Sequence, residues 1–204
     1  MTKGEDTRER LLQAAIELFA ERGYHATSLK DITSRAGRSP GLAYRYFRQK
    51  EDFVLALYGR IADELAQVEL PAGPAPARYA TVLREKLRLV RPHRVVLAAV
   101  VGALIDPANR LGLASDETRA VRDAVRAVVR AALVGADPPA PETWTEPLYA
   151  VHLLVLLVAI AAADPRAADA TVDLVEQLLT AVPPPLLSAL FARAEPIWPL
   201  LFPR

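Results

Sequence analysis

The feature that most constrains the fold is a pair of helix breakers in the stretch SRAGRSPGLAYRYFRQK, residues 34–50. Gly37 and Pro40 are three residues apart, and the residues on both sides have the composition of helices. Glycine adopts the left-handed conformation that ends a helix, whereas proline is favoured in the first turn of one. Ser39 has a side-chain oxygen that can cap a new helix. The stretch therefore predicts a tight turn followed by a short helix over 40–47.

The segments around this stretch also have helical periodicity. Between residues 7 and 22 the apolar side chains recur at spacings of three and four, which predicts an amphipathic helix. Thr27 or Ser28 is placed to cap a second helix, and Asp31 completes a capping box with Ser28. Another helix is expected over 49–69, because apolar residues follow there at intervals of four.

The helix, turn and helix expected over 27–47 form a helix-turn-helix unit, whose second helix enters the major groove of DNA. The charge distribution agrees with a polyanionic partner. The whole chain has a net charge of only +1, but between residues 27 and 50 Asp31 is the single acid among six cations. A solvated basic surface is the alternative explanation of this local excess.

Two runs of sequence resemble the DNA-binding signature of TetR-type transcriptional regulators: LLQAAIELFAERGYHATS and ATSLKDITSRAGRSPGLAYRYFRQKEDF. The resemblance covers residues 7–60. Arg38 stands where the family usually has valine, and Ala43 where it usually has leucine or isoleucine, with Leu42 beside it to fill the space. Neither departure removes a part that the fold needs.

The resemblance implies a role for each residue of the predicted interface. Thr27 or Ser28 would hold a phosphate at the start of the second helix. Arg38 and Arg45 are candidates for contact with a base or a phosphate. The residues expected at or near the bases are Ser39, Pro40, Gly41 and Leu42. The residues expected to bind phosphates are Tyr44, Tyr46 and Lys50.

The resemblance also implies partners. Family members bind a near-palindromic double-stranded operator as homodimers, with two reading helices about 34–36 Å apart. Their C-terminal domain binds a small-molecule effector and pairs the last two large helices of each subunit. In this chain the paired helices would be 143–163 with 167–181, or 167–181 with 185–200.

The rest of the chain begins after the proline-rich segment PAGPAPA at 71–77, which ends the preceding helix. We expect an all-α fold of about nine to ten helices. The helix-turn-helix DNA-binding domain would span 1–50, a helix over 50–69 would connect it, and a helical effector-binding and dimerisation domain would span 71–204. The helices expected in this last domain are 75–90, 93–105, 116–134, 143–163, 167–181 and 185–200.

Two apolar segments of this domain need cover. The run over 148–163 is about one turn short of a membrane span and contains His152, which favours a buried helix. The tail must be covered by a partner subunit or by its own core. Its apolar residues are Phe191, Ile197, Trp198, Leu200, Leu201 and Phe202.

Polar groups in the C-terminal region are candidates for effector binding. Each also fits a packing role or a surface role, as a hydrogen-bonded core histidine would explain His152. The candidates are Tyr79, Arg88, His93, Trp144, Tyr149 and His152. Two cationic clusters, over 84–94 and 119–130, would suit either an acidic effector or a solvated helix face.

No motif indicates catalysis. The chain has no cysteine, its histidines lack metal-ligand spacing, and GxSxG, HExxH, P-loop and GxGxxG motifs are absent. We therefore expect no enzyme activity, no cofactor and no metal. The charged N-terminus does not resemble a secretory signal and indicates a cytoplasmic protein that does not enter a membrane. Two functions remain: a ligand-responsive DNA-binding repressor, or a helical small-molecule-binding or interaction protein without sequence-specific DNA binding.

Overall fold

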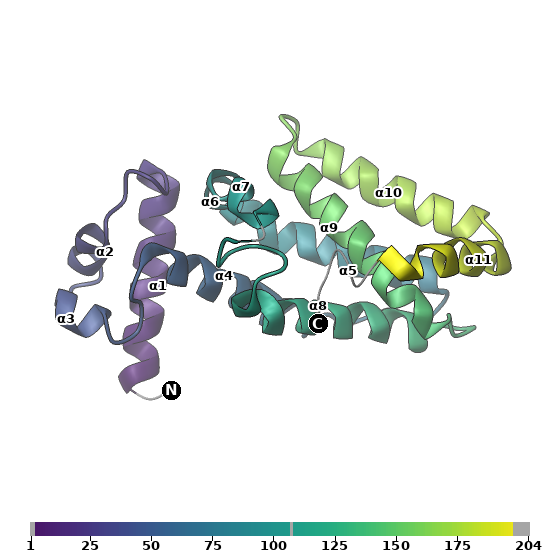
Figure 1. Cartoon of the computed structure of the whole chain (residues 1–204), viewed down its shortest axis with the longest axis horizontal. Coiled ribbons are helices and arrows are strands. Elements are labelled where there is room, and N and C mark those ends of the chain that lie inside the picture. Colours follow the sequence, from purple (N-terminus) through teal and green to yellow (C-terminus); the bar gives the residue numbers. More distant parts are fainter. Residues whose placement is uncertain (1–2, 107, 198–204) are drawn as a thin grey trace. The chain divides into compact units, whose positions relative to one another are not determined.

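The computed structural model describes residues 3–106 and 108–197, and every regular element in this part of the chain is helical (Figure 1). The expected all-α class is therefore confirmed. The chain divides into two compact units. The N-terminal unit contains residues 1–60 and 92–118, and the C-terminal unit contains residues 61–91 and 119–204.

The N-terminal unit is built around α1 (Lys3–Arg22). Helices α2 (Leu29–Arg35) and α3 (Pro40–Ala43) lie on one side of α1 and are followed by α4 (Lys50–Leu65) (Figure 1). Aromatic packing joins the end of this segment to α4, because the rings of Phe47 and Phe53 stack with centroids 4.0 Å apart. Further fully buried residues of the unit are Leu11, Leu12, Phe19, Ile32 and Leu57.

A second stretch of sequence completes this unit. The helix expected over 93–105 is broken at Val100 into α6 (Arg94–Ala99) and α7 (Val101–Ile105), and η2 (Asp116–Thr118) follows. Arg110 ties the stretch to the start of α4, because its guanidinium lies 3.0 Å from Asp52 and 2.8 Å from Glu117. Residues 92–118 thus pack with residues 1–60, although sequence patterns alone group them with the C-terminal domain.

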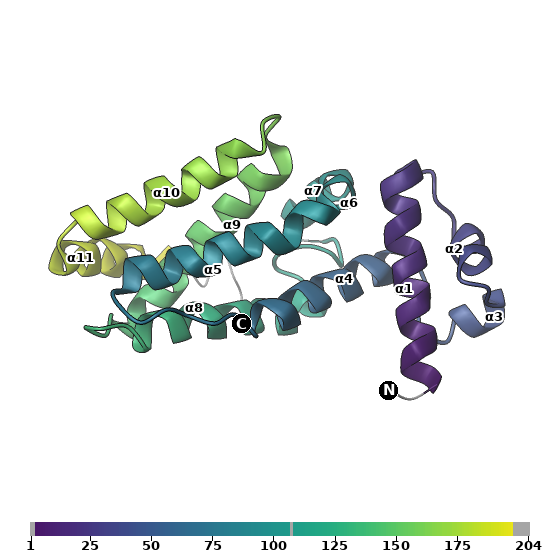
Figure 2. The same cartoon turned by 180° about the vertical axis from the view of Figure 1, so that it is seen from behind.

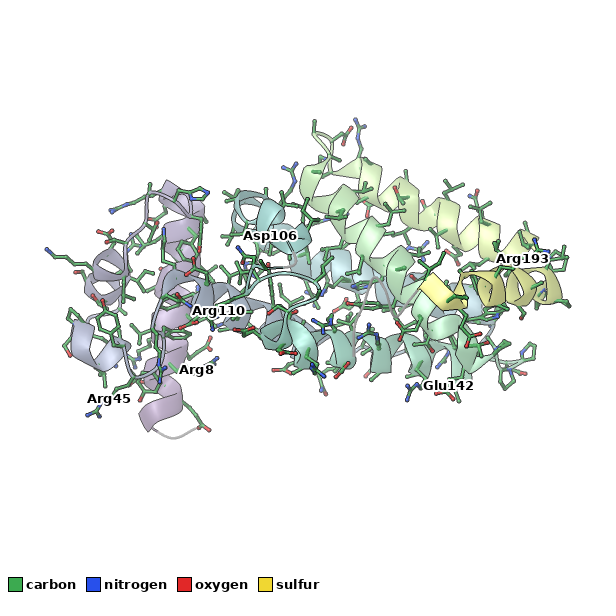
Figure 3. The ribbon with its side chains drawn as sticks, in the orientation of Figure 1. Arg8, Arg45, Asp106, Arg110, Glu142 and Arg193 are labelled. Carbon is green, nitrogen blue, oxygen red and sulfur yellow. The ribbon has the colours of Figure 1, made fainter. Side chains whose placement is uncertain are left out.

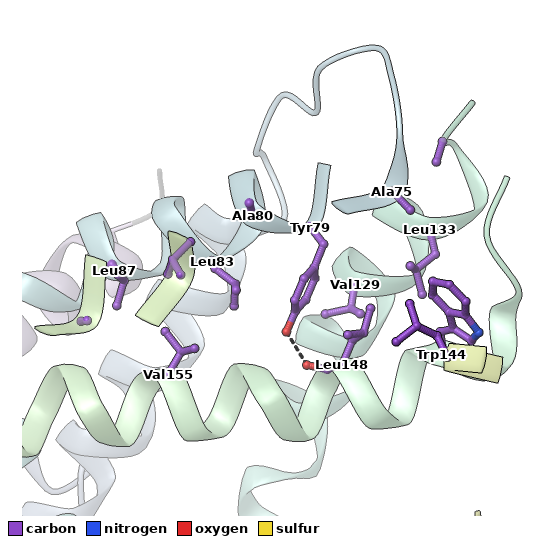
Figure 4. Packing of buried hydrophobic residues seen from close by; sticks show 14 residues of the cluster. Ala75, Tyr79, Ala80, Leu83, Leu87, Val129, Leu133, Trp144, Leu148 and Val155 are labelled. Atoms are coloured by element: carbon purple, nitrogen blue, oxygen red, sulfur yellow. Dashed lines mark hydrogen bonds between the residues drawn. The ribbon is translucent and has the colours of Figure 1, made fainter. Parts of the chain in front are cut away.

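Helices α5 (Ala75–Val90), α8 (Arg119–Val134), α9 (Thr145–Ala161) and α10 (Arg166–Ala181) form the body of the C-terminal unit. Figure 2 shows α5 and α10 running side by side. The remaining helical segments are η1 (Arg91–His93), η3 (Glu142–Trp144), α11 (Pro184–Ala194) and η4 (Glu195–Ile197). In the core, Leu83 and Leu87 of α5 belong to the same cluster as Leu148 and Val155 of α9 (Figure 4).

One buried arginine holds the C-terminal end of α8. Arg78 of α5 is 8% exposed and donates through Nε and Nη2 to the carbonyls of Ala132 and Ala131, at 2.9 and 3.1 Å. Its Nη1 donates to the carbonyl of Pro71. A Cβ atom at Gly135 would lie 2.6 Å from Nη2, so a larger residue there would shift the guanidinium. The charge also lies where the helix dipole favours a cation.

The apolar helix belongs to the core. The stretch Glu142–Ala161 has a mean hydropathy of 1.7 and is long enough to cross a bilayer, but its residues Leu148, His152 and Val155 are almost completely buried in the unit. The stretch is 44% buried and Leu154 is 57% exposed, so α9 contributes one face to the core of the unit. In the tail, Phe191 packs edge-on against Trp144 with ring centroids 5.6 Å apart. Trp198, Leu200, Leu201 and Phe202 lie outside the described residues.

Candidate nucleic-acid interface

The turn between α2 and α3 has the expected geometry. Gly37 has φ +61°, which is the left-handed conformation that glycine adopts most readily. The amide of Arg38 donates to the carbonyl of Thr33 at 3.0 Å and so closes the end of α2. Ser39 caps α3 by accepting the amide of Leu42 at 3.3 Å, and Pro40 occupies its first turn. The predicted turn and cap are confirmed.

At the start of α2, Ser28 and Thr27 have different hydrogen bonds and different exposure. The Ser28 hydroxyl accepts the Asp31 amide at 3.2 Å, and the Asp31 carboxylate accepts the Ser28 amide at 2.9 Å. The Ser28 hydroxyl also donates to the Asp31 carboxylate, and this bond, together with the one from the Ser28 amide, holds the pKa of Asp31 below its ordinary value. Thr27 is 2% exposed, and its hydroxyl donates to the carbonyl of Gly23 at 2.9 Å. Of the two residues expected at the start of α2, the Thr27 side chain is thus enclosed in the fold and Ser28 is exposed.

Helix α3 is shorter than the expected 40–47 and ends at Ala43. The Ala43 carbonyl accepts the amides of both Tyr46 and Phe47 at 2.9 Å, so the chain continues as a hydrogen-bonded turn. The turn buries Phe47 and Ala43, which are 1% and 0% exposed, and leaves Tyr44 54% exposed. Leu42 is half-buried beside Ala43. The shortened helix thus leaves the Tyr44 phenol exposed to solvent, and the turn after it buries the Phe47 ring in the core.

The residues expected near DNA differ in exposure. Ser39, Pro40, Gly41 and Arg45 are exposed, and Tyr46 is half-buried. The side chain of Arg45 lies next to α3 and projects away from the ribbon (Figure 3).

Three cations of the basic segment already have partners within the unit. Arg35 pairs with Glu21 at 2.7 Å, and Arg38 lies 3.8 Å from Asp6. Lys50 donates from Nζ to the carbonyl of Tyr24 at 2.8 Å and lies 4.6 Å from the centre of the Tyr24 ring. The half-buried Lys50 thus braces the loop between α1 and α2, a role that the sequence did not indicate.

The remaining cations of the segment are Lys30, Arg45 and Arg48, which are all exposed. Among the described residues, none of their side chains forms an ion pair or a side-chain hydrogen bond. Sequence reasoning selected Arg45 but omitted Lys30 and Arg48, because only the fold separates paired from unpaired cations. The positive charge available to an anionic partner is therefore smaller than the residue count indicates, and it is concentrated on these three side chains.

The effector candidates do not form one group. Tyr79 is buried and donates to the carbonyl of Leu148 at 2.5 Å, and Trp144 donates from Nε1 to Ser188 at 3.0 Å. These contacts are accounted for by core packing. Arg88 is exposed and pairs with Glu85 at 2.7 Å.

His93 belongs to η1, next to the boundary between the units, and is half-buried. Tyr149 and His152 are the two candidates that the structure brings together, with parallel rings whose centroids are 6.2 Å apart. Both rings are almost completely buried in the C-terminal unit.

Comparisons with known proteins agree on the N-terminal helices. The family model for bacterial regulatory proteins of the tetR family matches residues 11–57. The HTH-type transcriptional activator FasR of Mycolicibacterium smegmatis is 33% identical over 102 residues, which cover 50% of this chain and 40% of the relative. An HTH-type transcriptional repressor of Mycobacterium tuberculosis is 38% identical over 74 residues, which cover 36% of this chain and 39% of the relative. The matches thus span about two fifths of the length of these relatives.

Solved structures extend the likeness to most of the chain. A tetR-family transcriptional regulator from Streptomyces coelicolor has a TM-score of 0.63 and 25% identity, and the match covers 95% of this chain and 89% of that chain. A putative TetR-family regulator from Syntrophomonas wolfei, at 17% identity, shares the fold with a TM-score of 0.62 over 89% of this chain and 98% of that chain. Residues 11–57, with their capped helix-turn-helix, therefore match the tetR family of bacterial regulatory proteins, and most of the chain shares the fold of solved TetR-family structures.

Proposed function

We propose that the protein is a ligand-responsive DNA-binding transcriptional regulator that binds a near-palindromic operator as a homodimer and is released by a small-molecule effector. The observation that carries this proposal is the exposed, unpaired positive charge of Arg45 and Arg48 beside a locally capped α3. Such cations gain most from an anionic surface, because no internal ion pair has to be broken before they bind phosphates.

Arg45 is the arginine that we assign to base recognition. It is exposed and unpaired, whereas Arg38 is half-buried and close to Asp6. An arginine that binds a guanine edge through two hydrogen bonds contributes roughly 1–3 kcal/mol of discrimination. We assign phosphate contacts to Tyr44, Tyr46 and Arg48, which would fix the position of α3 without reading sequence.

The exposed apolar residues of α10 and α11 support dimerisation through these helices. Leu174 and Leu178 are each 53% exposed on α10, at a spacing of four. Leu186 and Leu190 are 62% and 61% exposed on α11, at the same spacing. Two such faces would form a four-helix bundle with a second copy of the chain. Of the two pairings open from the sequence, this favours the one between 167–181 and 185–200.

We propose repression as the output, because a protein bound to an operator can exclude other proteins from it without a further contact. The named relatives include both an activator and a repressor, so their names do not decide between activation and repression. The site of action would be the cytoplasm, where the operator is accessible.

The proposal is tested with a labelled duplex that carries the chain's own upstream region, and with a shuffled duplex of the same composition. We expect nanomolar affinity for the upstream duplex, a steep loss of affinity with added salt, and a complex whose mass by light scattering contains an even number of chains. Absent or salt-insensitive binding would instead support a helical small-molecule-binding protein without sequence-specific DNA binding.

A further inference from the structure

The C-terminal unit buries a group of polar side chains where α5, α8 and α9 pack together. Lys86 of α5 is 7% exposed, and His152 and Tyr149 of α9 are each 2% exposed. Arg122 of α8 is 4% exposed and lies on the same helix face as the buried Val125 and Val129. A lysine is seldom buried to the extent of Lys86 without a partner. The cationic clusters over 84–94 and 119–130 are thus only partly solvated faces.

Lys86 stands on an apolar face of α5. Its neighbours at helical spacings of three and four include Val82, Leu89 and Val90, all buried, and none of these positions is acidic. Among the described residues, its ammonium has neither an ion pair nor a hydrogen-bond acceptor. Burial lowers the pKa of Lys86 to about 8, so the side chain remains mostly charged at neutral pH. A buried charge without a counter-charge is destabilising.

The nearby carboxylates are already engaged. Glu146 and Asp123 both pair with Arg126, at 2.9 and 3.3 Å from its guanidinium nitrogens. The Arg126 guanidinium also lies 4.4 Å from the centre of the Tyr149 ring. The acids of α10 pair with other arginines of the C-terminal unit: Asp169 with Arg91, and Asp173 and Glu176 with Arg84. No acid of these helices is therefore left to balance Lys86.

His152 adds a polar atom that is also without a partner. Its Nδ1 is buried and makes no hydrogen bond within the described part of the chain. Burial and the charge of Lys86 lower the pKa of His152 to about 3, so the imidazole is neutral. Lys86 and His152 lie on α5 and α9, which pack against each other. A neutral imidazole can offer one N–H donor to an anion without adding a second unbalanced charge.

We propose that Lys86 and His152 bind the carboxylate of a small organic acid, and that such an acid is the effector class of this regulator. The effector role rests on the proposed function, whereas the carboxylate site rests on the buried, unpaired groups. The carboxylate supplies the missing counter-charge to Lys86 and accepts a hydrogen bond from His152. One unmatched ammonium balances a single negative charge, which favours a monocarboxylate over a phosphate dianion. The apolar neighbours of Lys86 suit a hydrocarbon body.

The test measures thermal unfolding of the full chain without DNA, so that it is independent of operator binding. The probes are hexanoate and phenylacetate at millimolar concentration, with hexanamide and phenylacetamide as neutral controls. A ligand that binds the folded state raises its unfolding temperature by mass action. The variant Lys86→Met removes the charge and keeps the side-chain length. Arg166→Met, at an exposed position of α10, is the matched control that removes a positive charge elsewhere in the same unit. Lys86→Arg retains a charge at the site.

We expect at least one acid to raise the unfolding temperature of the wild type and of Arg166→Met, with its amide at least about tenfold weaker, because the amide lacks the charge that pairs with Lys86. Lys86→Met should lose this response, and Lys86→Arg should retain the preference for acid over amide. Equal responses to acid and amide, an unchanged acid response in Lys86→Met, or no response to either acid would overturn the proposal. A positive acid response with no DNA binding would leave the carboxylate site intact and reject the regulator function.

Discussion

The two units hold their unpaired positive charge in opposite environments. In the N-terminal unit, Lys30, Arg45 and Arg48 are exposed, so water hydrates them until a polyanion arrives. In the C-terminal unit, Lys86 is 7% exposed and has no counter-charge. An exposed cation costs little to leave unpaired and suits a large, salt-sensitive partner. A buried cation destabilises the fold until a ligand neutralises its charge. Such a site therefore suits a small, specific ligand.

The units also differ in the range of the contacts that hold them. Helices α2 and α3 are capped from within the same short segment: Ser28 accepts the amide of Asp31, and Ser39 accepts the amide of Leu42. The end of α8 is held instead by Arg78, more than 50 residues earlier in the chain, whose partners are at separations of 54 and 53 residues. Mutations should therefore act locally in the first unit and across the whole core in the second.

The largest effect on stability is expected for Arg78→Met. The substitution leaves the carbonyls of Pro71, Ala131 and Ala132 without their donor, at about 1–3 kcal/mol for each one that stays buried, so the free energy of unfolding should fall by roughly 3–5 kcal/mol in total. Chemical denaturation followed by circular dichroism measures this loss. Arg84→Met is the matched control, because Arg84 is half-exposed and its ion pairs with α10 should contribute no more than about 1 kcal/mol. Equal losses in the two variants would contradict the role assigned to Arg78.

Lys86→Met is expected to have the next largest effect and the opposite sign. Without ligand, it should raise the free energy of unfolding by about 2–3 kcal/mol at neutral pH, because it removes a buried charge that lacks a partner. Denaturation of both proteins in the same buffer measures the difference. A destabilised Lys86→Met would indicate that the ammonium has a stabilising partner, and this would remove the contrast between the units.

The pH dependence of this difference has a defined sign. The pKa of Lys86 is about 8 in the folded protein and about 10.5 ordinarily, so below pH 8 the lysine is charged in both states and the burial penalty is complete. Between these values the folded state loses the proton first, and the stability of the wild type should rise relative to that of Lys86→Met. A difference that stays constant from pH 7 to 10 would contradict the burial of a charged Lys86.

The smallest effect is expected at the cap of α3. Ser39→Ala removes the acceptor of the Leu42 amide and should lower the free energy of unfolding by about 1 kcal/mol. Ser34→Ala is the matched control, because Ser34 is exposed within α2 and alanine favours a helix. Thermal unfolding of the two variants compares them directly. A loss in Ser34→Ala as large as that in Ser39→Ala would remove the evidence for local capping.

The N-terminal helices could be predicted from the sequence because their signals are local. Gly37, Ser39 and Pro40 mark the turn through their own conformational preferences, and the capping box at Ser28 depends on residues three apart. The end of α3 was predicted four residues too late, because the burial of Phe47 and Ala43 sets it.

Side-chain pairing could not be predicted in the same way. The sequence does not indicate that Arg35 pairs with Glu21 or that Lys50 bonds to the carbonyl of Tyr24, since these partners lie 14 and 26 positions away. It does not indicate that Thr27 is enclosed either, because burial is set by the fold. The burial of Lys86 is likewise a tertiary effect, because the pattern of α5 is compatible with an exposed lysine. Sequence therefore identified the DNA-binding region, while the separation of available from engaged cations required the fold.

The central claim is that the unpaired exposed cations, rather than the whole basic segment, bind DNA. It is tested most directly by the salt dependence of affinity for the upstream duplex, measured by fluorescence anisotropy for the wild type, Arg48→Ala and Arg35→Ala. We predict that Arg48→Ala lowers the slope of log affinity against log salt by about 1, since one phosphate contact is lost. Arg35→Ala, whose guanidinium is bound to Glu21, should keep the wild-type slope. Identical slopes for all three proteins, or a larger change in Arg35→Ala than in Arg48→Ala, would contradict this claim.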